Sequence, residues 1–131
     1  MGSVKSVEEL EVFKKAHSLT VNVYKISTKF PAEEKFGLIT QIRRSAASVC
    51  ANLMEVSHRL GRKEFRQFVG ISRDSAGELK YHLLLAKDLG YLPNKDFFIL
   101  RSEAEEISKM LYGLANSLSD THTDTGTVTK T

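Results

Sequence analysis

The fold of this chain is decided by residues 41–78, which read QIRRSAASVCANLMEVSHRLGRKEFRQFVGISRDSAGE. Apolar residues recur there and just before at steps of three and four. This apolar series is Ile39, Ile42, Ala46, Val49, Leu53, Val56 and Leu60. A second series, mostly polar, runs one residue earlier. It comprises Leu38, Gln41, Ser45, Ser48, Asn52, Glu55 and Arg59. Successive residues of an α-helix are about 100° apart, so the two series predict a helix with an apolar stripe beside a polar one.

The same three-four spacing continues on both sides and predicts four helices, over about residues 6–29, 33–58, 62–90 and 94–119. Ser6 and Glu9 have the spacing of a capping box, which would start the first helix. Gly90 suits a left-handed position that ends the third helix, and Asn94 is the expected cap of the fourth. Residues 120–131 are rich in Thr, Asp and Gly, so we expect a flexible polar tail.

These elements predict an all-α fold, an antiparallel up-down-up-down four-helix bundle formed by residues 1–119. Short connections favour antiparallel neighbours. The apolar stripes follow the 3.5-residue repeat that gives left-handed packing.

Composition indicates an ordinary globular protein with no membrane role. The chain has 131 residues, of which 41% are hydrophobic and 27% charged, and its formal net charge is +3. Cys50 is the only cysteine, and no apolar run approaches the roughly 18 residues of a membrane span. We therefore expect a cytoplasmic protein.

Nothing in the sequence predicts catalysis. Metal sites in bundles use Glu-x-x-His pairs, and this spacing does not occur here. The histidines are scattered at His17, His58, His82 and His122. Cys50 has no cysteine partner, and the glycines stand singly rather than in a phosphate-binding loop. We expect no enzyme, no metal and no cofactor, and an enzyme with a site in the bundle core is the least favoured hypothesis.

The polar series has three interpretations. Together with two residues of the third helix it forms a predicted polar seam: Gln41, Ser45, Ser48, Asn52, Glu55, Ser75 and Glu78. A hydrogen-bonded structural network is favoured, because buried polar groups need partners. A contact between subunits and a ligand site are the alternatives.

A basic cluster lies in the same region. It consists of Arg43, Arg44, Arg59, Arg62, Lys63 and Arg66. Against these six cations stand Glu55 and Glu64, which leaves a net charge of +4. Arginine binds phosphates through its planar fork, so the cluster is a candidate nucleic-acid-binding surface. The alternative is that Arg43 or Arg44 pairs with a carboxylate such as Glu78 while the others are solvated.

Several short motifs resemble a known family. In chain order they are Leu10-Glu11-Val12-Phe13, Tyr24-Lys25, Phe30-Pro31, Gln41-Ile42-Arg43-Arg44-Ser45-Ala46, Ser48-Val49, Asn52, Glu55, Arg59, Lys63-Glu64-Phe65, Ser75, Glu78-Leu79 and Leu89-Gly90-Tyr91. This ordered set resembles the bacterial four-helix-bundle proteins encoded within intervening sequences of 23S rRNA genes, over about residues 7–118. The family often has proline where Cys50 stands and glycine where Val56 stands, so the end of the second helix is expected to be straighter here.

The resemblance implies a homopentameric ring. It also implies kinship with the accessory variability determinant of diversity-generating retroelements, which binds nucleic acid and a reverse transcriptase through a basic ring surface. An apolar strip on the third helix, Val69, Ile71, Leu84 and Leu85, independently suggests self-association.

Two main hypotheses follow. In the first, an oligomeric non-enzymatic bundle binds rRNA or other structured RNA, or an RNA-protein partner such as a ribosomal protein or a reverse transcriptase. In the second, a structural or adaptor bundle recruits another protein and has no nucleic-acid role.

Overall fold

All regular structure in the part of the chain that is described is helical. The structure is a computed structural model and describes residues 7–56 and 61–118. The long helices are α1 (Glu11–Ser27), α2 (Leu38–Val56), α3 (Arg62–Asp88) and α4 (Asn94–Ser117). Two short 3-10 turns, η1 (Val7–Glu9) and η2 (Ala32–Glu34), precede α1 and α2. The all-α class with four long helices is therefore confirmed.

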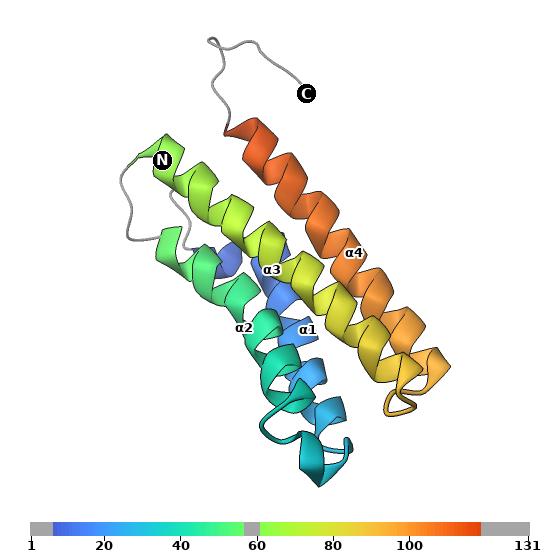
Figure 1. The fold of residues 1–131 in the computed structure, drawn as a ribbon. Helices are drawn as coiled ribbons and strands as arrows, with labels where there is room; N and C mark the ends of the chain where they lie inside the picture. The colour runs from blue at the N-terminus through green and yellow to red at the C-terminus, as the bar shows by residue number, and fades with distance from the viewer. Residues whose placement is uncertain (1–6, 57–60, 119–131) are drawn as a thin grey trace.

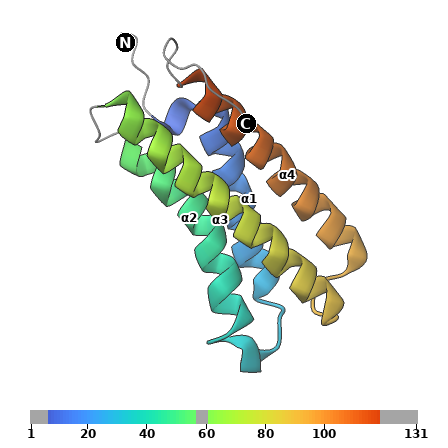
Figure 2. The same cartoon turned by 45° about the horizontal axis from the view of Figure 1, so that its top comes forward.

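Each long helix packs against two others. The contacts of α2 with α3 and of α3 with α4 are the most extensive, and those of α1 with α2 and with α4 are smaller. Within the described residues no Cα atom of α1 lies within 8 Å of one in α3, and the same holds for α2 and α4. The helices thus occupy the four corners of a bundle, and in Figure 1 and Figure 2 the chain reverses direction between successive helices. The finer prediction of a left-handed up-down-up-down bundle stays a prediction, as does the boundary at residue 119.

The first helix begins later than the capping-box spacing predicts. Residues Val7–Glu9 form a 3-10 turn, and the backbone N–H of Leu10 donates to the carbonyl oxygen of Val7 at 3.0 Å. The α-helix then starts at Glu11, and its N-cap residue Leu10 makes no side-chain capping hydrogen bond. Ser6 itself lies outside the described residues. The helix also ends at Ser27 rather than near residue 29.

The fourth helix has a different cap from the predicted one. Pro93 is the N-cap residue, with φ −60° and ψ 148°, and Asn94 is the first helical residue. The carbonyl oxygen of Pro93 accepts the backbone N–H of Phe97 at 2.9 Å. Because the proline ring fixes φ near the value that this position needs, an Asn side-chain cap is not required.

Helix α3 ends as the sequence predicts. Gly90 has φ 83°, the left-handed conformation that favours glycine. Its N–H donates to the carbonyl of Lys87, and the N–H of Tyr91 donates to the carbonyl of Ala86, both at 2.9 Å. These two bonds form a Schellman motif, which satisfies carbonyls at the helix end. The following residue, Leu92, is buried in the core.

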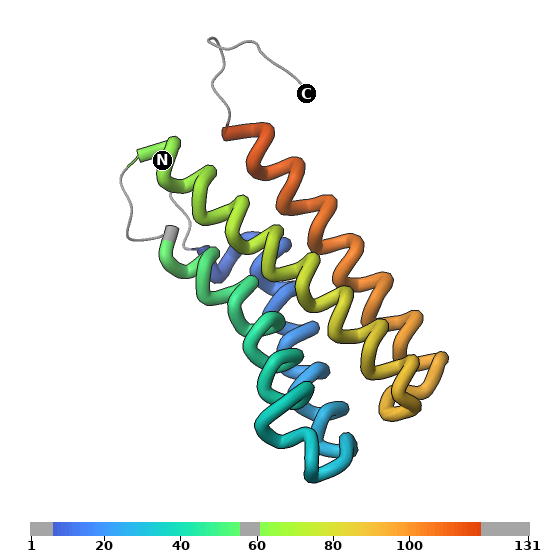
Figure 3. The backbone as a smooth tube through the Cα atoms, viewed as in Figure 1, coloured from blue at the N-terminus to red at the C-terminus, as the bar shows by residue number. Residues whose placement is uncertain are grey.

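Helix α2 begins at Leu38 rather than near residue 33, because the side chain of Glu34 provides its cap. The Glu34 Oε1 atom accepts the backbone N–H of Leu38 at 3.1 Å. The Oε2 atom accepts the phenolic O–H of Tyr91 at 2.9 Å. The Tyr91 ring also lies against that of Phe30, with ring centroids 5.7 Å apart. The hydrogen bond between Tyr91 and Glu34 therefore links the connection before α2 to the connection before α4. Both connections lie at the same end of the bundle (Figure 3).

The core is a continuous apolar layer supplied by all four helices. Its most deeply buried large side chains include Val23, Ile42, Leu53, Leu83 and Ile107. Among the residues described, no helix is both long enough and apolar enough to cross a membrane.

The apolar strip predicted on the outside of α3 is partly wrong. Val69 is fully buried and belongs to the core, and Leu85 is half-buried against it. Ile71 and Leu84 do lie on the surface, 41% and 37% exposed. Helical spacing alone does not distinguish the edge of a core stripe from a second surface.

Candidate functional site

The centre of the predicted polar seam lies between α2 and α3. The hydroxyl oxygens of Ser48 and Ser75 are 2.9 Å apart and share a hydrogen bond. Asn52 donates from Nδ2 to the Ser48 carbonyl oxygen at 2.9 Å and to Ser48 Oγ at 3.0 Å. These three side chains therefore form a connected group across the two helices.

A further serine hydrogen-bonds across the same seam. The fully buried Ser72 donates from Oγ to the carbonyl oxygen of Val49 at 2.8 Å. Its side chain is small enough to let the two backbones approach closely, and the hydrogen bond of its hydroxyl offsets the cost of removing that group from water.

Ser45 contacts His82, a residue that was not predicted to be part of the seam. Ser45 Oγ lies 3.2 Å from Nδ1 of His82 and also donates to the carbonyl oxygen of Ile42 at 3.2 Å. Burial lowers the pKa of His82, and the positive charge of Arg44 lowers it further, while Glu78 partly offsets both. His82 follows Ser75 by seven residues, or two helical turns, and therefore lies on the same stripe of α3. This spacing was the signal in the sequence that could have placed His82 in the seam.

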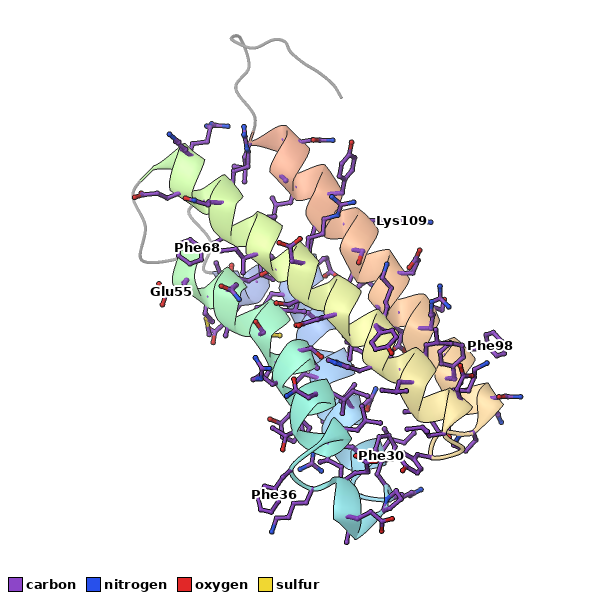
Figure 4. The ribbon with its side chains drawn as sticks, viewed as in Figure 1. Phe30, Phe36, Glu55, Phe68, Phe98 and Lys109 are labelled. Carbon is purple, nitrogen blue, oxygen red and sulfur yellow. The ribbon has the colours of Figure 1, made fainter. Side chains whose placement is uncertain are left out.

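The remaining predicted seam residues lie at its margins. Gln41 is half-buried, and its Oε1 accepts a hydrogen bond from Nη2 of Arg44 at 2.7 Å. Glu78 is exposed on α3, where its charge raises the pKa of His82. Glu55 is exposed near the end of α2, as its label in Figure 4 shows.

The predicted basic cluster is divided between two parts of the molecule. Arg43 and Arg44 lie near the start of α2, whereas Arg62, Lys63 and Arg66 are exposed at the start of α3. The 12 residues from Arg44 to the end of α2 rise about 18 Å, so the two groups do not form one continuous patch. Arg59 lies outside the described residues.

Arg43 is held by α1 through neutral groups. Its Nε donates to Ser27 Oγ at 2.8 Å and its Nη2 to the carbonyl oxygen of Tyr24 at 3.2 Å. Its guanidinium carbon lies 4.8 Å from the centroid of the Tyr24 ring. Arg43 therefore packs α1 against α2.

The ion pairs in the described residues lie elsewhere. They join Lys15 to Glu106, Lys80 to Glu105 and Lys87 to Asp88. Within the same residues Arg62, Lys63 and Arg66 have no carboxylate partner, and Arg62 donates only to the carbonyl oxygen of Ser117 at 3.5 Å. The cations at the start of α3 are thus available to an external anion.

The chemistry of the remaining reactive groups is limited. Ser45 is only 2% exposed, so its contact with His82 does not present a nucleophile to a substrate. Burial raises the pKa of the Cys50 thiol, and a hydrogen bond with Thr20 only partly offsets this, which disfavours the reactive thiolate. No group of three or more His, Cys, Asp or Glu residues able to hold a metal ion occurs in the described ranges.

Comparison with known proteins defines the class of this four-helix protein. The profile of the family described as 23S rRNA-intervening sequence protein matches residues 8–113. The chain therefore belongs to this family, as the resemblance in its motifs predicted.

A solved relative has the same fold. It is a protein of unknown function from the S23 ribosomal protein family of Bacteroides thetaiotaomicron, known from a crystal structure. It is 25% identical to this chain, with a TM-score of 0.72, and the match covers 79% of this chain and 97% of the relative. A search of curated proteins found no match.

Proposed function

We propose that this protein is a non-enzymatic, self-associating bundle that binds structured RNA through the cations at the start of α3. With this we propose the left-handed up-down-up-down arrangement and a cytoplasmic location, which suits a chain whose one thiol has no disulfide partner. Ribosomal RNA is the RNA that the family's name suggests.

The observation that carries the proposal is the difference between paired and unpaired cations. Lys15, Lys80 and Lys87 each have a carboxylate within 4 Å. Arg62, Lys63 and Arg66 have none among the described residues and are exposed, so a phosphate backbone could reach them. Arg62 and Lys63 also lie in the first turn of α3, where the helix dipole adds positive potential, and Arg66 follows in the next turn.

The cations near the start of α2 are less suited to RNA. Arg43 donates two hydrogen bonds to α1, and its guanidinium group lies over the Tyr24 ring. We therefore assign RNA contact to Arg62, Lys63 and Arg66.

A salt titration tests this assignment. Binding of a labelled 23S rRNA fragment is measured by fluorescence polarisation over a range of salt concentrations, for the full chain and for R62Q/K63Q/R66Q. Each phosphate contact contributes close to one unit to the slope of log affinity against log salt. We expect the slope of the triple variant to be shallower by about two to three.

The matched control is K15Q/K80Q/K87Q, which removes the same net charge from cations that already have partners. We expect it to bind nearly as well as the unaltered protein. Absence of binding by the unaltered protein at low salt, or equal losses in the two triple variants, would contradict RNA binding at this surface.

One observation favours the adaptor hypothesis as the second candidate. Phe36 is 88% exposed and points away from the bundle, and Phe98 is 62% exposed on α4 (Figure 4). Exposed aromatic side chains are common anchors at protein interfaces. A pull-down from nuclease-treated lysate, compared with one using F36S, separates the hypotheses: a partner that survives nuclease and is lost with F36S supports the adaptor.

A further inference from the structure

The cations at the start of α3 continue along the helix as a row beside α4. We define the arginine row as Arg62, Arg66 and Arg73, which are spaced by four and seven residues and so lie on one side of α3. At one end of the row Arg62 donates to the carbonyl oxygen of Ser117 on α4 at 3.5 Å. At the other end the guanidinium group of Arg73 lies over the ring of Tyr112, also on α4. The row therefore follows the junction of α3 and α4, which run side by side in Figure 1.

The arginine row is long and open. The 11 residues from Arg62 to Arg73 rise about 16 Å along the helix axis, and one nucleic-acid strand advances about 3.4 Å per stacked nucleotide. Gly70 lies in the row between Arg66 and Arg73, and a Cβ atom added to it would meet nothing within 4 Å. The same holds for Gly113 on α4. The row thus offers room for several nucleotides of one strand.

Tyr112 is the exposed aromatic residue at the end of the arginine row. It is 51% exposed, and the Arg73 guanidinium carbon lies 4.7 Å from its ring centroid. Its hydroxyl makes no hydrogen bond to any of the described residues. Nucleic-acid bases stack on aromatic rings and on the planar guanidinium group of arginine. Arg73 and Tyr112 therefore combine both kinds of surface in one place.

The charge around Tyr112 also suits a phosphate backbone. Arg73 is exposed and, like the cations at the start of α3, has no carboxylate partner among the described residues. Lys109 is exposed three residues before Tyr112 on α4 and adds a further cation (Figure 4). Phosphate contacts alone do not distinguish one form of RNA from another. A stacking surface does, because a duplex keeps its bases paired inside the helix, whereas a single strand can turn a base outward.

We infer that Arg73 and Tyr112 form a stacking platform for an unpaired base, so that the arginine row binds a single-stranded stretch of RNA. This inference rests on the proposed function and names the kind of RNA that the same surface takes. Arg62 and Arg66 contact the phosphates, and a base farther along the strand lies against the platform. Because every base has an aromatic face, the platform accepts all four bases.

A comparison of two RNAs tests the platform. One is a labelled single strand that cannot pair with itself, and the other is a blunt duplex of the same length. Binding of each to the full chain is measured by fluorescence polarisation at low salt. We expect the unaltered chain to prefer the single strand. We expect Y112L to weaken single-strand binding by about 5- to 100-fold, the range for losing one stacked base, and to leave duplex binding unchanged. Y112F keeps the ring and should bind like the unaltered chain.

The matched control is Y81L. Tyr81 is an exposed tyrosine on α3, 58% exposed, with no Lys or Arg over its ring among the described residues, so we expect this variant to bind both RNAs normally. Salt dependence separates the two members of the platform. R73Q should lower the single-strand salt slope by about 0.7, the value for one phosphate contact. Y112L should leave that slope unchanged because it removes no charge.

The outcomes distinguish the platform from RNA binding itself. Circular dichroism checks that all variants keep their helical content. Equal binding of both RNAs by the unaltered chain would overturn the platform, as would equal single-strand binding by Y112L and Y81L, or an equal loss for both RNAs in Y112L. In each of these cases RNA binding by the cations of α3 would stand. If the unaltered chain bound neither RNA at low salt, the proposed function would fail, and the platform with it.

Discussion

Helix α3 is held on its two sides by different interactions. Toward α2 it uses small hydroxyl side chains inside the interface, where Ser72 is fully buried and Ser75 nearly so. Toward α4 its interior contacts are apolar, and its polar contacts lie at the margin, where Lys80 pairs with Glu105 at 2.8 Å and Arg73 lies over the Tyr112 ring.

The difference shows that the contribution of a polar interaction to stability depends on where it lies. A hydroxyl inside the α2–α3 seam has a defined partner and leaves no room for a larger side chain. A charged pair at the α3–α4 margin exchanges with water and salt. We therefore expect substitutions in the first seam to affect stability more than substitutions at the second margin.

The largest effect should come from enlarging a seam serine. We expect S72L to lower the free energy of unfolding by about 1–3 kcal/mol, because the buried site has no space for the added atoms. S72A should cost less, about 0.5–1.5 kcal/mol, since it only removes a hydrogen bond. Urea denaturation of both variants measures this. The control is I71L at the exposed neighbouring position, and an S72L protein as stable as I71L would refute close packing of the seam.

A smaller, pH-dependent effect should come from His82. Burial holds the pKa of His82 below its usual value, against a smaller opposing effect of the Glu78 charge, so the folded state favours the neutral ring. As the pH falls below about 6.5, the unfolded chain takes up the proton first and the free energy of unfolding decreases until the folded pKa is reached. Urea midpoints between pH 8 and pH 5.5 should fall more for the unaltered protein than for H82N. If the urea midpoints of the two proteins fell equally over this pH range, His82 would not be the source of the pH dependence.

The smallest effect should come from the margin ion pair. Lys80 and Glu105 are partly exposed, with 27% and 47% of their side-chain surface accessible. We expect E105Q to lower the free energy of unfolding by about 0.2–1 kcal/mol. The difference should vanish at about 1 M salt, where the screening length is near 3 Å. If the loss of unfolding free energy did not depend on salt, the pair would be shielded from dissolved ions, as the seam serines are.

Much of the fold was predictable because apolar spacing reports helices directly. The start of α3, the left-handed Gly90 and the existence of four helices all follow from local patterns. The helix starts at Glu11 and Leu38 were missed, because a 3-10 turn and a folded-back carboxylate replaced the expected caps. The residue at which each of these helices starts therefore depends on contacts with other parts of the chain.

The candidate sites were less predictable because they depend on distance between helices. The heptad pattern placed Ser48 and Ser75 on facing stripes, and they do meet. The contact of Ser45 with His82 spans 37 residues, and its one signal in the sequence was the seven-residue spacing of His82 from Ser75. Similarly, Arg43 and Arg62 looked like members of one cluster, although α2 separates them along the bundle axis.

The absence of a side chain at residue 37 has a consequence for both connections at one end of the bundle. A Cβ atom added to Gly37 would come within 2.8 Å of Glu34 Oε1, the oxygen that accepts the Leu38 N–H. The same carboxylate also receives the Tyr91 hydroxyl. An alanine at position 37 would thus make the Glu34 side chain shift and would disturb both of its hydrogen bonds at once, so relatives that gain a side chain there should also have exchanged the acid at 34 and the phenol at 91.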